Sequence, residues 1–127
     1  MRRSSLAVAT ALGALAALAA AARAQPAGDP AKGETAFNDV CTQCHTIGGV
    51  AAGPNLAGVV GRKAGASDYP YSDAMKASGL TWTPANLERF LADPAAVVPG
   101  TAMTGVTVPS AAERANIVAY LAAQKGR

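Results

Sequence analysis

The feature that most constrains the fold is a long stretch with neither helical nor strand periodicity, residues 46–71. It contains six Gly and two Pro and is predicted to form one continuous loop. Loops of this length are unusual inside a small domain, and the chain of 127 residues has room for only one domain. Short helices alone cannot easily bury enough apolar surface to fix such a loop. We therefore expect something other than side chains to occupy the centre of the fold.

Local start and stop signals predict a small all-α fold with four to five short helices. Asp29 followed by Pro30 predicts a helix that runs to about Val40. No run of alternating apolar and polar residues predicts a strand. The remaining helices are predicted from Ser72 to Ser78, from Thr83-Pro84 to before Pro94, for one turn after Asp93-Pro94, and from Ser110, with its capping partner Glu113, through Ile117, Val118 and Leu121.

Residues 1–24 are predicted to be a cleaved signal peptide. A positively charged start precedes an Ala/Leu-rich run that ends on Ala22-Arg23-Ala24, the small-x-small pattern of a cleavage site. An uncleaved membrane anchor is the alternative, since 19 uncharged residues separate Arg3 from Arg23. Alanine is only weakly hydrophobic, and polar sequence follows at once, which favours cleavage. The prediction is a single domain of residues 25–127, exported to the periplasm, with no membrane span in its mature form.

The net positive charge of the chain comes entirely from this first segment. The full sequence has a formal net charge of +3, and Arg2, Arg3 and Arg23 account for it. The lysines and arginines of residues 25–127 are balanced by an equal number of acidic side chains. A nucleic-acid-binding protein is therefore not expected, because such proteins carry a basic surface.

Cys41, Cys44 and His45 are the only cysteines and the only histidine of the chain. A disulfide between Cys41 and Cys44 would close a trivial loop, and a thioredoxin-like pair needs a βαβ context that is absent here. Zinc needs four ligands, and only three such side chains are present. Covalent haem attachment fits, because both thiols can add to the vinyl groups and His45 can bind the iron. Haem c, with its iron, is the expected cofactor and would fill the centre of the fold.

Beyond this motif, an ordered set of short segments spans about 90 residues of the chain. In this order and spacing the chain resembles the class I cytochromes c, the family of mitochondrial cytochrome c and its periplasmic bacterial relatives. The resemblance implies the small cytochrome c fold wrapped around one covalent haem. The matching segments are Gly33, Phe37 and Cys41–His45, Gly53-Pro54-Asn55-Leu56 with Gly58, Gly61-Arg62-Lys63, Tyr71-Ser72-Asp73-Ala74, Gly79-Leu80-Thr81-Trp82, Pro99-Gly100-Thr101 with Met103, and Tyr120-Leu121.

The resemblance also implies the second iron ligand. Met103 lies in a Pro-Gly-Thr-x-Met segment like the one with which the family presents a thioether to the iron, opposite the histidine that corresponds to His45. Met75, the other methionine of residues 25–127, is expected to pack against the haem instead. Ligation by His and Met raises the reduction potential relative to two histidines and leaves no axial position open.

Four further cofactor-binding residues are carried over from the family. Pro54 resembles the proline whose carbonyl accepts the imidazole N–H of the histidine ligand. Tyr71 and Trp82 resemble the pair whose O–H and N–H groups reach a haem propionate. Arg62 resembles the arginine that neutralises the propionate region.

The resemblance implies a soluble one-electron Fe(III)/Fe(II) carrier that is not an enzyme. It is expected to be a monomer that docks transiently with respiratory or photosynthetic redox proteins, such as a reductase, an oxidase or a reaction centre. One alternative is a haem enzyme or sensor in which a labile Met103 opens an axial site. Another is a membrane-tethered or complex-bound cytochrome subunit.

The sequence departs from the family around the exposed haem edge. Phe90 stands where the family often has a tyrosine whose hydroxyl bonds the methionine sulfur. Ala95, Ala96 and Ala102 stand where the family has lysines. We therefore expect docking through a mainly apolar patch, with weak dependence on ionic strength.

Overall fold

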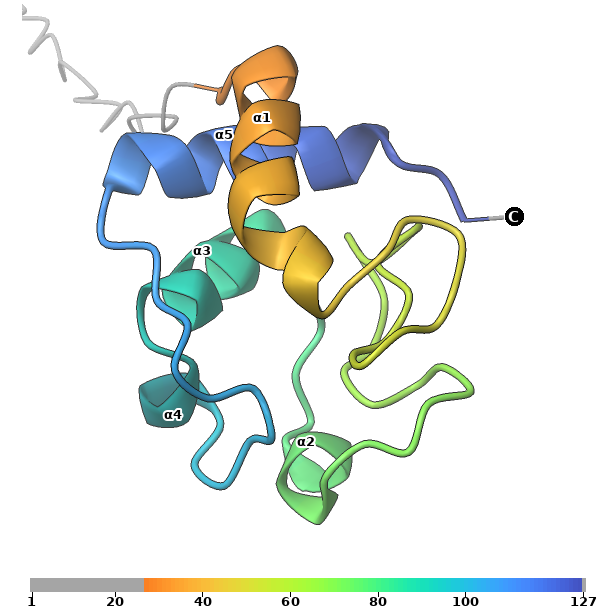
Figure 1. Cartoon of the computed structure of the whole chain (residues 1–127). Coiled ribbons are helices and arrows are strands. Elements are labelled where there is room, and N and C mark those ends of the chain that lie inside the picture. The colour runs from red at the N-terminus through yellow and green to blue at the C-terminus, as the bar shows by residue number, and fades with distance from the viewer. Residues whose placement is uncertain (1–26, 127) are drawn as a thin grey trace, which may run out of the picture.

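The computed structural model describes residues 27–126, so the predicted signal peptide, residues 1–24, lies outside the described residues. Between residues 27 and 126 there is no strand, and a single isolated bridge pairs Lys63 with Thr81. The predicted all-α class is confirmed. The elements are α1 (Pro30–Val40), the 3₁₀ turn η1 (Cys41–Gln43), α2 (Asp73–Ala77), α3 (Pro84–Ala92), α4 (Pro94–Val97) and α5 (Ala111–Ala123) (Figure 1).

The helices begin at the capping residues that the sequence indicates. The Asp29 carboxylate accepts hydrogen bonds from the backbone N–H groups of Ala31 and Lys32, and Pro30 occupies the first helical position of α1. At the start of α5, the Ser110 hydroxyl accepts from the N–H of Glu113 at 3.2 Å. Such caps use neighbouring residues only, which is why they can be predicted locally.

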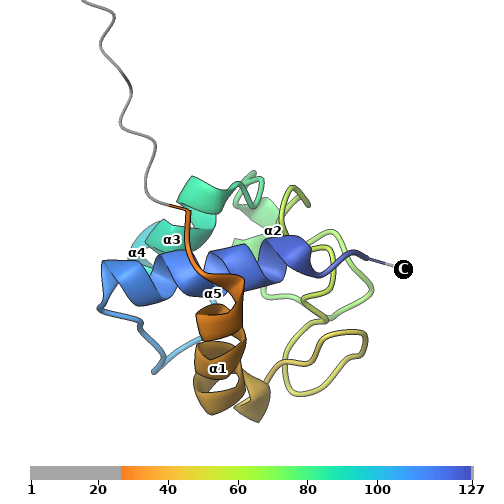
Figure 2. The same cartoon turned by 90° about the horizontal axis from the view of Figure 1, so that it is seen from above.

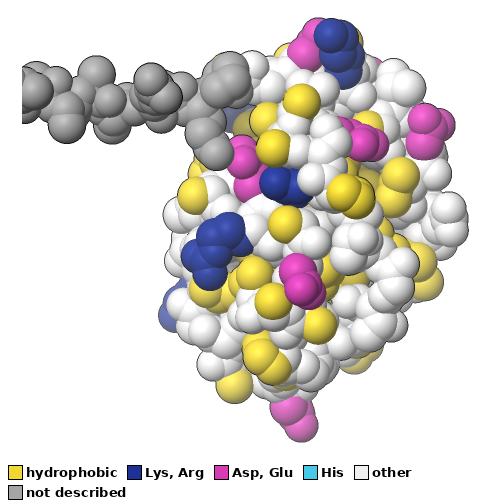
Figure 3. All heavy atoms as spheres, turned by 90° about the vertical axis from the view of Figure 1, so that its left-hand side faces the viewer, with side chains coloured by type: hydrophobic (Ala, Val, Ile, Leu, Met, Phe, Trp, Pro, Cys, Tyr) yellow, Lys and Arg dark blue, Asp and Glu magenta, His cyan; other side chains and the backbone are white. Residues whose placement is uncertain are grey.

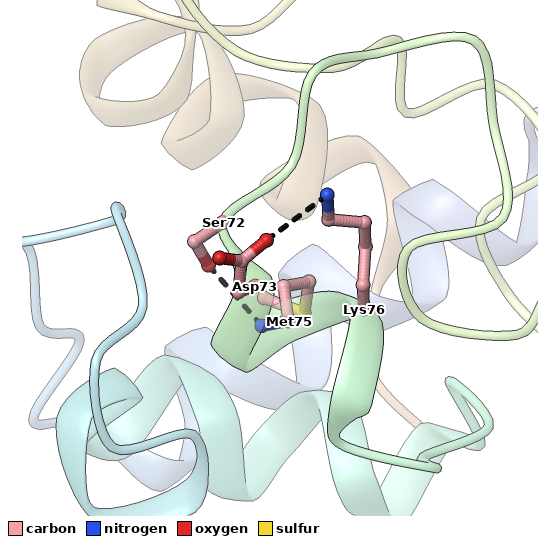
Figure 4. A network of polar contacts seen from close by, with 4 residues as sticks. All are labelled: Ser72, Asp73, Met75 and Lys76. Carbon is pink, nitrogen blue, oxygen red and sulfur yellow. Dashed lines mark hydrogen bonds and ion pairs between the residues drawn. The ribbon is translucent and has the colours of Figure 1, made fainter.

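The short helix α2 is held at its first turn by two polar contacts (Figure 4). The Ser72 hydroxyl accepts a hydrogen bond from the Met75 N–H at 3.1 Å, and Lys76 pairs with Asp73 at 3.1 Å. The ion pair is exposed, so it stabilises the helix only slightly. The Met75 side chain is only 8% exposed and belongs to the hydrophobic core. These contacts fix the backbone that carries Met75.

Helices α1 and α5 cross at the top of the molecule (Figures 1 and 2). Gly33 lies at the crossing, where a Cβ atom would collide with the backbone carbonyl of Asn116. One turn further along α1, the ring of Phe37 packs against Tyr120 with centroids 5.2 Å apart. The side-chain oxygen of Asn116 also accepts the N–H of Asp29 at 2.7 Å. Close approach of the two backbones therefore requires glycine at position 33.

We expect Gly33→Ala to lower the free energy of unfolding of the holoprotein by about 3 kcal/mol, since backbone atoms must move to admit the methyl group. Denaturant titration followed by circular dichroism measures this. Gly126→Ala is the matched control, because its Cβ would meet nothing closer than 3.6 Å. The control should stay within about 0.5 kcal/mol of the parent. If both substitutions lowered the free energy of unfolding equally, the close approach of α1 and α5 at Gly33 would not be the cause.

The long Gly/Pro-rich loop follows α1 and η1 and reaches α2 without regular structure, as predicted (yellow to green in Figure 1). Backbone hydrogen bonds tie it to distant segments: the N–H of Gly58 donates to the Gln124 carbonyl at 2.7 Å, and that of Gly61 to the Trp82 carbonyl at 2.8 Å. The loop thus closes one side of the core. The buried core comprises Phe37, Val59, Met75, Trp82, Leu87, Phe90, Leu91, Val98, Val108, Ile117, Val118 and Leu121.

Among residues 27–126, no helix has the length and apolar character that crossing a membrane would require.

Candidate functional site

A central cavity of about 280 Å³ lies between α1, the long loop, α2, α3 and the segment before α5. Most of its lining is apolar, and Arg62 is the only Lys, Arg, Asp or Glu among the described residues that line it. The size and the apolar lining of this cavity fit a large apolar group. All eight site residues that the sequence predicts line this one cavity: Cys41, Cys44, His45, Pro54, Arg62, Tyr71, Trp82 and Met103.

The two cysteines lie at the turn that ends α1. The N–H of Cys44 donates to the Cys41 carbonyl at 3.1 Å, and the N–H of His45 donates to the same carbonyl at 2.8 Å. Both thiols are free, with Cys41 half-buried and Cys44 exposed. Burial, with a smaller contribution from the negative charge of Glu113, raises the pKa of Cys41 to about 11. Burial therefore favours the protonated form of the Cys41 thiol.

His45 is held by the loop that follows it. Its Nδ1 atom lies 2.9 Å from the Pro54 carbonyl oxygen. Since a carbonyl only accepts, Nδ1 carries the proton and Nε2 keeps the lone pair that can bind a metal. Gly53 makes this position possible, because a Cβ there would lie 2.6 Å from the His45 ring. The Gly53 N–H also donates to the Cys44 carbonyl at 2.6 Å, which draws the loop against the histidine.

Tyr69 is a contributor that the sequence did not single out. Its hydroxyl donates to the Ala52 carbonyl at 2.6 Å, across 17 residues of chain, and its ring packs edge-on against Tyr71 with centroids 5.1 Å apart. Ala52 immediately precedes Gly53 and Pro54, the two residues that hold His45. The bond therefore ties the part of the loop that holds His45 to the far end of the loop. The only signal in the sequence is the pair of tyrosines at positions 69 and 71. It does not indicate which group accepts the hydrogen bond of the Tyr69 hydroxyl.

We expect Tyr69→Phe to loosen the loop around His45 while leaving the haem attached. Loss of one well-formed hydrogen bond should lower the free energy of unfolding by about 1 kcal/mol. Amide hydrogen exchange should accelerate about fivefold at Gly53 and Leu56. Tyr120→Phe is the matched control, because it removes a tyrosine hydroxyl at the crossing of α1 and α5. Faster exchange at Gly53 in the control, or none in Tyr69→Phe, would contradict this role of Tyr69.

Arg62 makes contacts beyond the role predicted for it. Its guanidinium donates to the Asn55 carbonyl at 2.9 Å and to the Ala57 carbonyl at 3.4 Å. It therefore closes the loop between residues 55 and 62. Its position in the cavity lining also places a positive charge beside any acidic group bound there.

The two predicted propionate donors lie on the same cavity. The Tyr71 hydroxyl is hydrogen-bonded to the Ser67 hydroxyl. Trp82 is buried, and its ring packs against Phe90 with centroids 5.0 Å apart at 58°. Phe90, which stands where the family often has a tyrosine, thus supports the indole ring of Trp82.

Met103 lies on the loop between α4 and α5, and its side chain is half-buried against the core. Thr101, only 6% exposed, holds this loop: its N–H donates to the Val98 carbonyl at 3.0 Å, and its hydroxyl accepts the Met103 N–H at 3.2 Å. Gly100 adopts a φ of +88°, which favours glycine. Met75 lines the same cavity from α2, so the structure brings both thioethers to the site.

Within residues 27–126, no group of three or more His, Cys, Asp or Glu side chains is arranged to hold a bare metal ion. The donors that meet at the cavity are two thiols, one imidazole and two thioethers. This set suits haem iron, in which a macrocycle supplies the other ligands.

These features define a small helical protein built to enclose a covalently attached haem. The family model described as Cytochrome c matches residues 30–125. Among curated relatives, cytochrome c2 of Rhodomicrobium vannielii is 48% identical over 116 residues, which is 88% of this chain and 92% of that protein. Cytochrome c of Theileria annulata is 48% identical over 99 residues, covering 76% of this chain and 86% of that protein.

Solved structures give the same result. The chain is similar to cytochrome cH from Methylobacterium extorquens, with a TM-score of 0.72, 46% identity, and coverage of 75% of this chain and 98% of that one. The structure of cytochrome c2 from Rhodospirillum centenum gives a TM-score of 0.71 at 35% identity. The chain belongs to the cytochrome c family. It is an electron-transfer haem protein that carries haem c through Cys41 and Cys44, so the expected fold, cofactor and electron-transfer function are confirmed.

Proposed function

We propose that His45 and Met103 would hold the haem iron and that the protein is a one-electron carrier and not an enzyme. The observation that carries this proposal is the arrangement of His45: Nδ1 is occupied by the Pro54 carbonyl at 2.9 Å, which leaves Nε2 as the ligand atom. When bound, haem c supplies the reversible Fe(III)/Fe(II) couple. Pro54, Tyr71, Trp82 and Arg62 are proposed to hold the cofactor in the roles inferred above.

Both ligands are restrained by the chain, which suits electron transfer. Gly53 and Pro54 fix the His45 ring, while Thr101 fixes the loop that carries Met103. Little rearrangement is then needed when the iron changes oxidation state. If His45 and Met103 both held the iron, no ligand position would remain for a substrate, which supports electron transfer over catalysis.

The proposal includes export and transient partners. Residues 1–24 would be removed, and residues 25–127 would act in the periplasm as a monomer with no membrane span. The redox partners would be a reductase and an oxidase, or a photosynthetic reaction centre. Nucleic acid is not among the expected partners.

Carbon monoxide tests the ligand set. The ferrous protein at neutral pH should not bind it, since stable His/Met ligation leaves no open position, and redox titration should show one reversible one-electron step. Rapid formation of a carbon monoxide complex would instead indicate a labile Met103. The intact mass of protein from the periplasm should correspond to a chain that begins at Gln25 with one haem added. Recovery only from washed membranes with Arg2 and Arg3 retained would contradict cleavage.

A further inference from the structure

Ser67 meets Tyr71 near the end of the long loop. The backbone N–H of Tyr69 donates to the Ser67 carbonyl and that of Tyr71 to the Tyr69 carbonyl, both at 2.8 Å, which folds this segment into two successive tight turns. The hydroxyls of Ser67 and Tyr71 are hydrogen-bonded to each other across these turns. The Tyr69 ring packs edge-on against the Tyr71 ring and restrains it. Of the two bonded residues, Tyr71 lines the haem cavity and Ser67 does not.

Two hydroxyls that share one hydrogen bond use only one of their two protons. Among residues 27–126, neither the Ser67 nor the Tyr71 hydroxyl has another hydrogen-bond partner, so the second proton is left for an acceptor outside the pair. Haem c carries two carboxylates, and an ionised carboxylate is a strong acceptor. Since Tyr71 is the member of the pair on the cavity, the arrangement that uses both protons runs from Ser67 to Tyr71 and from Tyr71 to a haem carboxylate.

We propose that Ser67 is a positioning residue for the cofactor: its hydroxyl donates to the Tyr71 oxygen and so directs the Tyr71 proton toward a haem carboxylate. This inference rests on the proposed function, in which Tyr71 holds the cofactor. A hydroxyl that accepts one hydrogen bond is polarised and donates the next one more strongly. The ionised carboxylate is thereby stabilised over its protonated form. Because a negative charge near the iron favours the ferric state, Ser67 affects how the reduction potential depends on pH.

Few charges act on this hydroxyl pair. Arg62 is the only charged side chain that lines the cavity. The segments packed around the pair carry four more, Lys63 and Asp68 on the loop and Asp73 and Lys76 on α2, all of them exposed and therefore screened by water and salt. Asp73 and Lys76 also pair with each other at 3.1 Å (Figure 4). None of these side chains is hydrogen-bonded to either hydroxyl among the described residues.

The remaining surroundings are uncharged or bound to the cofactor. Residues 46–61, which Tyr69 contacts at Ala52, contain no charged side chain. The titratable Cys41, Cys44 and His45 of the lining are, in the proposed function, taken up by the haem and its iron. Further away, the face in Figure 3 shows acidic and basic side chains scattered among hydrophobic ones, so no field of one sign builds up there. Hydrogen bonds at the carboxylate therefore decide its ionisation.

The pH dependence of the reduction potential of the purified holoprotein tests this role. The potential should fall as the carboxylate ionises, and a weaker hydrogen bond should move that fall to higher pH. We expect a shift of about one pH unit in Tyr71→Phe, which loses a hydrogen bond to a charged group. Ser67→Ala only weakens that bond and should shift the fall by about 0.3 unit. Ser78→Ala is the matched control: this half-buried hydroxyl donates to the Met75 carbonyl at 2.8 Å, does not line the cavity, and its loss should leave the profile unchanged.

The double variant shows whether Ser67 acts through Tyr71. In the Tyr71→Phe background, Ser67→Ala should add no further shift, because the two hydroxyls act as one coupled unit. NMR of the ferrous protein gives a second readout that does not depend on the potential. The ring carbon that carries the Tyr71 hydroxyl should change its chemical shift in Ser67→Ala and keep it in Ser78→Ala.

The outcomes separate this inference from the proposed function. A Ser67→Ala profile equal to that of the wild type, or an equal shift by Ser67→Ala in both backgrounds, would overturn the role of Ser67 while that of Tyr71 stands. An unchanged profile in Tyr71→Phe would show instead that Tyr71 holds no carboxylate. The role of Ser67 would then fail together with that part of the proposed function.

Discussion

A chain in which both Cys41 and Cys44 are replaced by serine should yield essentially no covalent holoprotein. The two thiols are the attachment points, and no other cysteine exists to replace them. The loss should extend to the fold, because the cofactor occupies a cavity of about 280 Å³ lined mainly by apolar side chains. Without the cofactor these apolar side chains would face water instead of the macrocycle. The loss of this burial matters because the whole stability of a small domain is only about 5–15 kcal/mol.

Intact mass and far-ultraviolet circular dichroism measure the two effects separately. Thr42→Ser is the matched control, since it places a serine between the two cysteines and keeps the hydroxyl that donates to the Asn38 carbonyl at 2.6 Å. The control should retain haem through acid-acetone extraction. A double variant that folds fully without haem would show that the side chains alone suffice to form the core. A control that also loses haem would mean that any serine in the motif prevents attachment.

The parts of the fold that could be predicted are those determined by residues close together in the chain. Asp29 and Ser110 cap their helices through N–H groups two or three residues away, and the spacing of Cys41, Cys44 and His45 lies within one turn. The need for a central group was also visible, because a long Gly/Pro-rich loop cannot be fixed by a few short helices.

The contacts that hold the site in place could not be predicted where they depend on how the long loop folds back on itself. Tyr69 reaches the Ala52 carbonyl across 17 residues, and the Arg62 guanidinium donates to backbone carbonyls of Asn55 and Ala57. Every residue has a backbone carbonyl. The sequence therefore shows the donor side chain but not which carbonyl accepts its hydrogen bond. Gly53 was visible as part of a family motif, whereas its contact with the His45 ring follows only from the folded loop.

Replacement of Met103 by alanine should leave the haem attached and change its electronic properties. We expect the weak near-infrared band of a sulfur–iron bond to disappear from the ferric spectrum, and carbon monoxide to bind the ferrous protein. The reduction potential should fall on the order of 0.1 V or more, within the roughly 0.8 V over which axial ligands set it. The reason is that a thioether favours the ferrous state, and the water or hydroxide that replaces it does not.

Met75→Leu is the control that decides between the two thioethers at the cavity. Met75 is fixed on α2, whose first turn is closed by the Ser72 hydroxyl at 3.1 Å and by the ion pair of Asp73 and Lys76. Met103 lies on a loop that Thr101 anchors. In this loop Gly100 adopts a φ of +88°. A volume-conserving change at Met75 should therefore keep the near-infrared band and most of the stability. A band that survives Met103→Ala and vanishes in Met75→Leu would show that α2, not the loop before α5, supplies the iron ligand.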